Sequence, residues 1–178
     1  MTENSKIWLS PPHMGGAERD LVENAFETNW IAPVGPYISA FEKKLSILSE
    51  NSHIAALSSG TAAIHLALIL AGVKKGDSVI CSSFTFVASA NPIKYLGASP
   101  IFIDSEEETW NMCPELLSRA LKEGVKNNKK PKAIVLTHLY GMPAKIDEII
   151  TVANSFEVPI IEDAAEALGS KYKNQQVG

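Results

Sequence analysis

The sequence is poor in cysteine, has no long apolar run and carries no basic excess, and each shortage excludes a class of protein. Its two cysteines, Cys81 and Cys113, are far apart and form no CxxC pattern, so neither a metal site nor a disulfide framework is expected. We expect both to be small apolar side chains in a reducing compartment. The longest apolar stretch, residues 64–73, is too short to span a membrane.

The balance of charge excludes an ordinary nucleic-acid-binding protein. The formal net charge is −4, and the one basic run, residues 126–132, is interleaved with Asn and Pro as in a solvated loop. Residues 1–6 are polar and lack the apolar centre of a signal peptide. We therefore expect a cytoplasmic protein with neither nucleic acid nor a membrane among its partners.

Short apolar runs alternate with amphipathic stretches along the chain. The pattern predicts strands at residues 53–57, 78–81, 100–104, 133–137 and 158–161, and helices at residues 16–29, 36–48, 61–71, 86–96, 114–124 and 144–156. Strands that are nearly continuous apolar runs are typical of an α/β fold with a mostly parallel sheet and helices on both faces. Ligands of such sheets bind where the strands end at their carboxyl edge.

The turn after the first expected strand has the residues of a phosphate site. Gly60 allows close approach of the backbone, and Thr61 can cap the following helix. Free N–H groups and the positive end of the helix dipole would then face the ligand. An ordinary capped turn explains the same residues, and so short a motif does not decide between them.

Two further strand ends carry an aromatic ring and a carboxylate. Phe86 lies just past the strand at 78–81, where it can cover a planar ring or fill the core. Asp163 follows the apolar run 158–161 with no basic neighbour in sequence, although a buried carboxylate costs several kcal/mol unless it is paired. A protonated pyridine nitrogen would pair with it, and the ring would then act as an electron sink. A helix N-cap is the alternative for Asp163.

In this order, the three motifs resemble the nucleotide-sugar aminotransferases of DegT/StrS type, which have the fold type I of pyridoxal-phosphate (PLP) enzymes. The resemblance rests on residues 59–68, 85–89 and 161–169 and covers the chain from Ile7 onward. It implies PLP as cofactor, glutamate as amino donor, a nucleotide-linked 4-keto-6-deoxy sugar as acceptor, a role in polysaccharide biosynthesis, and a homodimer.

The resemblance also implies a role for individual residues. Gly60 and Thr61 would bind the PLP phosphate, Phe86 would stack on the pyridine ring, and Asp163 would pair with the ring nitrogen. Ala165 would pack on the opposite ring face, and Glu166 would reach the ring hydroxyl or the substrate. The segment expected to line the sugar-nucleotide pocket is Asn29, Trp30, Ile31 and Ala32.

Within the family, residues 9–14, 29–33 and 137–141 most resemble the enzymes that aminate UDP-4-keto-6-deoxy-N-acetylglucosamine on the way to bacillosamine. The branch that forms GDP-perosamine is similar. Family members carry an Asn-Gly-Asn-Lys type motif beyond the position of Gly178, and its lysine forms the Schiff base. We therefore expect residues 1–50 to be a helical, substrate-lining segment and residues 51–178 to be an incomplete PLP-binding large domain, truncated before that lysine.

On that basis the chain alone is expected to be an inactive fragment of an enzyme, with no catalytic residue and no metal site of its own. A PLP-dependent sugar dehydratase on the same scaffold, with histidine in place of the lysine, is one alternative. A regulator or scaffold without PLP is another, although it would not need Gly60, Thr61, Phe86 and Asp163 together. A nicotinamide enzyme is not expected, because no GxGxxG follows any expected strand.

Overall fold

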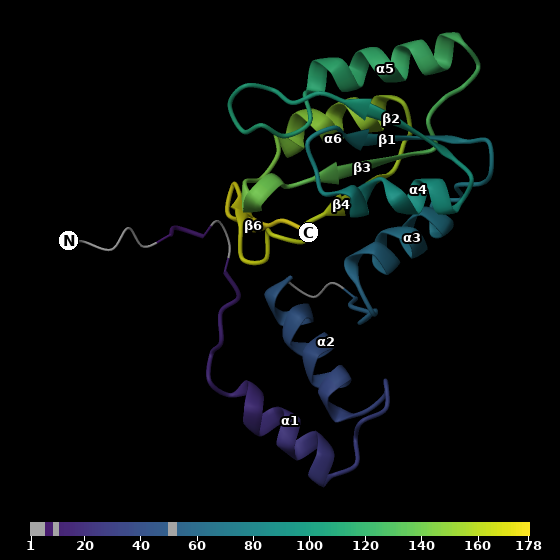
Figure 1. The fold of residues 1–178 in the computed structure, drawn as a ribbon. Helices are drawn as coiled ribbons and strands as arrows, with labels where there is room; N and C mark the ends of the chain where they lie inside the picture. The colour runs from purple at the N-terminus through teal and green to yellow at the C-terminus, as the bar shows by residue number, and fades with distance from the viewer. Residues whose placement is uncertain (1–5, 9–10, 50–52) are drawn as a thin grey trace.

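The computed structural model describes residues 6–8, 11–49 and 53–178 (Figure 1). Leu9 and Ser10 of the N-terminal motif lie outside the described residues. The helices are α1 (Glu18–Glu27), α2 (Pro36–Leu48), α3 (Gly60–Leu70), α4 (Asn91–Tyr95), α5 (Pro114–Lys126) and α6 (Ile146–Ser155), with 3-10 turns at Val87–Ser89 and Leu139–Gly141. The strands are β1 (Ser78–Ser82), β2 (Ser99–Ile103), β3 (Ala133–Thr137), β4 (Ile160–Asp163), β5 (Lys171–Tyr172) and β6 (Gln175–Gln176).

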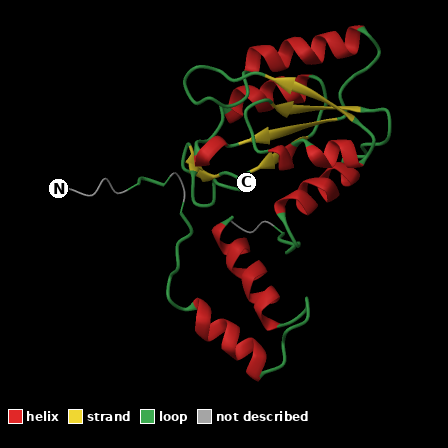
Figure 2. Cartoon of the chain, viewed as in Figure 1, coloured by secondary structure: helices red, strands yellow, loops and turns green. Residues whose placement is uncertain are grey.

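Four of these strands form a parallel sheet in the order β2-β1-β3-β4. Helices cover both faces, with α5 and α6 on one side and α3 and α4 on the other (Figures 1 and 2). The register pairs Thr137 with Asp163, so the last residues of β3 and β4 reach the carboxyl edge together. The expected α/β class with a parallel sheet is confirmed.

Strand β3 is the centre of the fold, and all five of its residues are buried. Its side chains alternate between two apolar clusters, as the period of a strand requires. Ile134 and Leu136 pack with the helices α5 and α6, whereas Ala133 and Val135 pack with α3 and α4. Burying an aliphatic side chain of this size stabilises the fold by about 1.5–3 kcal/mol, so the alternation holds both helical layers against the sheet.

Two expected elements differ from the structure. Residues 53–57 form no strand, because no described strand lies beside them to share a ladder, and the Ala56 N–H donates instead to Glu42 Oε1 at 2.9 Å. The helix expected at 86–96 is divided into the turn Val87–Ser89 and helix α4, which has Pro92 in its first turn. Proline lacks an N–H and cannot continue a helix that began upstream.

The last described residues contain a hairpin that the sequence pattern did not predict. Strands β5 and β6 pair antiparallel around Lys173 and Asn174, which have φ values of 47° and 69°. Positive φ at both central residues is typical of a two-residue type I′ turn. Two-residue strands are too short to show an apolar alternation, so the sequence pattern could not indicate this hairpin.

Helices α1 and α2 stand apart from the sheet (Figure 1). Neither has a buried residue, and the Tyr37 hydroxyl donates to Asn24 Oδ1 at 2.7 Å to join the two. Exposed apolar side chains on and between them include Leu21, Val22, Phe26, Ile31, Val34, Phe41 and Ile47. No helix in the described ranges is both long and apolar enough to cross a membrane.

Candidate functional site

A pocket of ≈390 Å³ lies at the carboxyl edge of the sheet. Three segments surround it, each following a different strand: residues 84–86 after β1, 137–140 after β3, and 163–166 after β4. Of the residues predicted to bind a cofactor, Phe86, Asp163, Ala165 and Glu166 line this pocket. A larger hollow of ≈540 Å³ between α5 and α6 is more open and holds none of the predicted residues, so we assign the site to the sheet edge.

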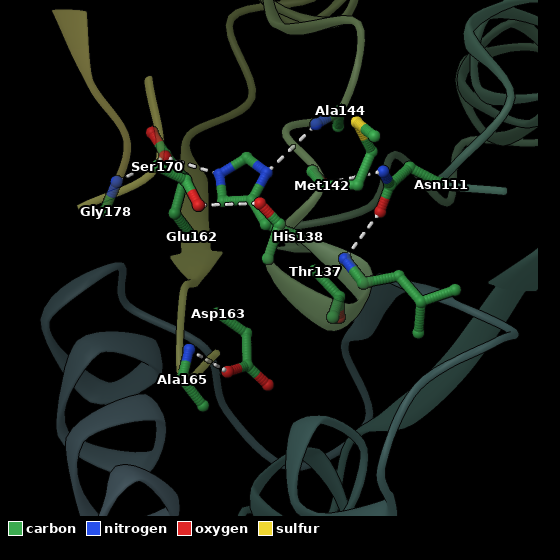
Figure 3. Close-up of polar contacts among 12 residues, drawn as sticks. Asn111, Thr137, His138, Met142, Ala144, Glu162, Asp163, Ala165, Ser170 and Gly178 are labelled. Atoms are coloured by element: carbon green, nitrogen blue, oxygen red, sulfur yellow. Dashed lines mark hydrogen bonds and ion pairs between the residues drawn. The ribbon is translucent and has the colours of Figure 1, made fainter. Parts of the chain in front are cut away.

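Asp163 is half-buried at the end of β4 and is held by one hydroxyl and one backbone N–H. Ser89 Oγ donates to Asp163 Oδ2 at 2.5 Å. The Ala165 N–H donates to Oδ1 at 3.4 Å (Figure 3). Ser89 also contacts Thr85 Oγ1 at 2.6 Å, and Thr85 contacts Thr137 Oγ1 at 3.0 Å. This chain of hydroxyls fixes the carboxylate orientation without neutralising its charge.

The N-cap alternative for Asp163 is wrong, because turns follow β4 where a helix would have to begin. Across residues 6–8, 11–49 and 53–178, no lysine, arginine or histidine forms an ion pair with Asp163. Burial, together with the nearby Asp163 charge, raises the pKa of the Cys81 thiol to about 12. An anionic group at the strand end with no cationic partner is free to accept one from a ligand.

Phe86 is a pocket residue and not a core residue. Its side chain is 79% exposed, which contradicts the alternative that it fills the core. Ala165 lines the same pocket from the β4 side. The pocket is therefore lined by an exposed aromatic ring from one segment and by a small residue from another.

The turn at the start of α3 differs in detail from the expectation. Ser59, and not Thr61, caps the helix, since Ser59 Oγ accepts from the Ala62 N–H at 3.2 Å. Gly60 has no positive φ, so the turn does not require its freedom, but a Cβ there would meet nothing within 4 Å. In the part of the chain that the structure describes, no group accepts from the N–H of Gly60 or Thr61.

Gly60 and Thr61 do not line the pocket, although α3 packs against β4. Their free N–H groups and the open space beside Gly60 suit an anion that approaches from outside the helix. The segment Asn29, Trp30, Ile31 and Ala32 is also away from the pocket, in the loop between α1 and α2. There Asn29 has a φ of 57°. The Trp30 ring packs so closely on Gly35 that a Cβ atom added to Gly35 would lie 2.9 Å from the ring.

His138 also lines the pocket; its side chain is buried and both of its ring nitrogens are used. Nδ1 accepts from the Ala144 N–H at 3.1 Å, so Nε2 carries the hydrogen that it shares with Glu162 Oε2 at 2.8 Å (Figure 3). That contact, with the Gly178 N–H donating to the same oxygen, lowers the pKa of Glu162 below its ordinary value. Both ring nitrogens of His138 are thus used to hold the surrounding segments together.

Sequence reasoning missed the contacts that hold the pocket wall. Glu166 Oε2 accepts from the Tyr140 N–H at 3.1 Å, and Tyr140 has a φ of 51°. Asn111, in the loop before α5, accepts from the Leu139 N–H at 2.8 Å and donates to the Met142 carbonyl at 2.9 Å. No sequence pattern indicates such contacts, because they join segments 26 and 31 residues apart.

Within the described ranges, no group of three or more His, Cys, Asp or Glu residues could hold a metal ion. Both cysteines are free, and Cys81 is buried whereas Cys113 is half-buried.

The chain has the fold of solved aminotransferases. It superposes on the PLP form of Spr1654 from Streptococcus pneumoniae, provisionally named a sugar aminotransferase, with a TM-score of 0.85 and 31% identity, over 97% of this chain and 46% of that one. The chain belongs to the DegT/DnrJ/EryC1/StrS aminotransferase family, whose sequence model matches residues 12–178.

Two relatives are similar to this chain over nearly its whole length. EpsN of Bacillus subtilis (strain 168), provisionally named a pyridoxal phosphate-dependent aminotransferase, is 55% identical over 175 residues, which are 98% of this chain and 45% of EpsN. GDP-perosamine synthase of Escherichia coli O157:H7 is 41% identical over 167 residues, 94% of this chain and 44% of the synthase. The chain therefore spans about half the length of the curated relatives it matches.

Proposed function

We propose that this chain is part of a PLP-dependent enzyme that transaminates a nucleotide-linked 4-keto-6-deoxy sugar with glutamate as amino donor. The observation that carries the proposal is Asp163, which lines the pocket with Phe86 and Ala165 and, within the described ranges, has hydroxyl and N–H partners only. Membership of an aminotransferase family and likeness to a structure in PLP form support the choice of cofactor.

The residues of the pocket fit PLP by their chemistry. When bound, PLP supplies an electron sink for the carbon that exchanges its amino group. Asp163 would hold a proton at the pyridine nitrogen, and Ser89 would keep the carboxylate aimed at it through the contact to Oδ2. Phe86 and Ala165 would bind opposite faces of the ring.

The phosphate end of the cofactor would bind at the start of α3. Gly60 and Thr61 offer N–H groups without partners in the described chain, and the helix end favours negative charge there. Glu166 would reach the ring hydroxyl or the substrate from the rim, where its other contact is the Tyr140 N–H. The amino group that holds PLP covalently would come from outside residues 1–178.

The identity of the acceptor sugar is the more specific part of the proposal. Residues 29–33 and 137–141 favour the bacillosamine-type acceptor, a UDP-linked 4-keto-6-deoxy-N-acetylglucosamine. The 41% identity to a GDP-perosamine synthase favours a GDP-linked acceptor as the second candidate. The sugar-nucleotide site would be lined by Asn29, Trp30, Ile31 and Ala32. We also propose that the full-length protein is a cytoplasmic homodimer.

The experiment is a screen of the full-length protein against UDP- and GDP-linked 4-keto-6-deoxy sugars, with glutamate as donor and amino-sugar formation followed by mass spectrometry. We expect amination of one nucleotide series by the wild type and none by Asp163→Asn. Loss of a hydroxyl group from a sugar carbon, without amination, would indicate the dehydratase alternative. No turnover of any sugar by a protein that binds PLP would contradict the proposal.

A further inference from the structure

One wall of the pocket is a loop with a conformation that its residues do not favour by themselves. Tyr140 adopts a φ of 51°, in the left-handed region that a bulky side chain rarely occupies. It follows Leu139 directly and lines the pocket with it. Such a backbone persists only where surrounding contacts hold it, so the source of those contacts determines the shape of the wall.

The contacts come from a residue that does not itself line the pocket. Asn111 is 2% exposed, and its carboxamide spans the loop: Oδ1 accepts from the Leu139 N–H at 2.8 Å, and Nδ2 donates to the Met142 carbonyl at 2.9 Å. Figure 3 shows this side chain beside Met142. A carboxamide carries a donor and an acceptor side by side, so Asn111 holds the two ends of the Leu139–Gly141 turn.

The loop that carries Asn111 is itself anchored. Glu106 accepts from the N–H groups of Glu108 and Thr109, both at 2.9 Å, and pairs with Lys145 Nζ at 3.2 Å. Burial raises the pKa of Glu106, but these contacts and the Thr109 hydroxyl outweigh it and lower that pKa to about 2. Lys145 belongs to the segment that follows the Tyr140 turn, so the two loops are joined at a second point.

On the far side, the Tyr140 turn lies against the segment after β4. The Tyr140 N–H donates to Glu166 Oε2 at 3.1 Å, and Ser170 Oγ donates to the Gly141 carbonyl at 2.7 Å. Gly141 has a φ of 80°, and a Cβ there would meet the Glu166 carbonyl oxygen at 2.8 Å. The turn is thus held between Asn111 on one side and Glu166 on the other.

We infer that Asn111 is a positioning residue: it holds the Leu139–Gly141 turn so that the Tyr140 N–H fixes the Glu166 carboxylate at the pocket rim. The functional half of this inference rests on the proposed transamination. Asn111 touches neither the pocket nor a ligand in it. It acts through Tyr140 on Glu166, the rim residue expected to meet the ring hydroxyl or the substrate.

The test uses the full-length protein with Asn111→Ala, Asn111→Asp and Leu121→Val. Leu121 is fully buried in α5 and its side chain makes no hydrogen bond, so its truncation controls for lost stability alone. Amide hydrogen exchange is measured without cofactor or substrate. We expect exchange at Leu139 and Tyr140 to be about tenfold faster in Asn111→Ala, because a buried donor has lost its acceptor. Glu166→Ala should speed amide exchange at Tyr140 and leave exchange at Leu139 as slow as in the wild type.

The same variants separate positioning from stability in kinetics. Asn111→Ala should raise KM for the keto sugar about tenfold with PLP affinity near that of the wild type, because other elements carry Asp163 and Phe86. Asn111→Asp should regain activity as pH falls, since a protonated carboxyl both donates and accepts. If Asn111→Ala does not fold, the pH dependence of the activity of Asn111→Asp tests the positioning role instead. Leu121→Val should leave KM unchanged.

Two results would overturn the inference. One is unchanged exchange at Leu139 in both Asn111 variants, and the other is faster exchange with wild-type kcat and KM. A full-length wild type that aminates no keto sugar would contradict the proposed function instead, and the exchange pattern of Leu139 and Tyr140 would still decide the role of Asn111.

Discussion

At the scale of single residues, the pocket combines an exposed ring with a carboxylate held in place by hydroxyls. Phe86 presents most of its surface to solvent, whereas Asp163 is half-buried and anchored by Ser89. Exposing a phenylalanine and leaving a carboxylate without a cationic partner both oppose the ordinary preferences of folding. Their presence together at one strand edge is best explained by a ligand that covers the ring and pairs with the charge.

Phe86→Ala should weaken cofactor binding without destabilising the protein. An aromatic stacking contact is worth about 0.5–1.5 kcal/mol, which corresponds to roughly a twofold to tenfold loss of PLP affinity. Since the ring is 79% exposed, the free energy of unfolding of the apo-protein should change by less than about 0.5 kcal/mol. PLP titration and urea unfolding measure the two quantities. A loss of about 3–5 kcal/mol in apo-stability would instead indicate a core phenylalanine.

Glu162 should make stability depend on pH in the acid range. Its pKa is lowered in the folded protein by His138 and by the Gly178 N–H. A lowered pKa means that the folded state binds the proton more weakly than the unfolded state. The stabilisation is therefore complete above about pH 4.3, the ordinary pKa of glutamate, and is lost as pH falls through the lower folded value.

Urea unfolding of the full-length protein between pH 3 and pH 6 measures this dependence. Glu162→Gln should reduce the slope of stability against pH below about pH 4.3. Glu23→Gln, on the exposed face of α1, is the matched control and should leave the slope as in the wild type. A slope unaffected by Glu162→Gln would remove the His138 contact from the account.

At the scale of elements, the sequence pattern was most reliable where the signal is local. The strand at 133–137 and the helix at 36–48 have the predicted bounds, because a continuous apolar run and a first-turn proline are local signals. The strand predicted at residues 53–57 does not form, because a strand needs a neighbouring strand to share hydrogen bonds with. The local apolar pattern does not show whether such a neighbour is present. The helix at 86–96 failed because Pro92 interrupts the ladder of hydrogen bonds.

The same distinction applies to the site. Residues at strand ends, such as Asp163 and Glu166, could be predicted, because parallel strands bring their carboxyl ends to one edge. Ser89 and Asn111 could not, because their roles depend on hydrogen bonds between segments 74 and 31 residues apart. The capping of α3 needed geometry as well, since Ser59 and Thr61 are both good caps in sequence.

Ser59→Ala should destabilise α3 more than Thr61→Ala. The Ser59 hydroxyl satisfies the Ala62 N–H at the helix start, and removing such a cap costs about 0.5–2 kcal/mol. Thr61 lies within the first turn, where alanine is the better helix former, so its replacement should cost little or nothing. Thermal unfolding of both apo-variants compares them. Equal losses would mean that the two hydroxyls share the capping role.

At the scale of the whole molecule, the match to an aminotransferase family and the layered fold indicate the same class of protein. The chain matches the aminotransferase family over residues 12–178, and its sheet carries the pocket at the edge where α/β folds bind ligands. Helices α1 and α2 expose a broad set of apolar side chains, which is typical of surfaces that other parts of a protein cover. The proposed homodimer should therefore be sought in the full-length protein by sedimentation.

In the proposed function, Asp163 activates a bound PLP ring for transamination. The most direct test is the single-turnover half-reaction of the full-length protein with glutamate, followed by the absorbance of the cofactor, in the wild type and in Asp163→Asn. Asparagine keeps the shape and the contact to Ser89 but cannot hold the ring nitrogen protonated. We predict that Asp163→Asn retains PLP and loses the half-reaction by at least about 100-fold, as expected when a charge-assisted contact to the reacting ring is removed. A half-reaction near the wild-type rate in Asp163→Asn would contradict the account.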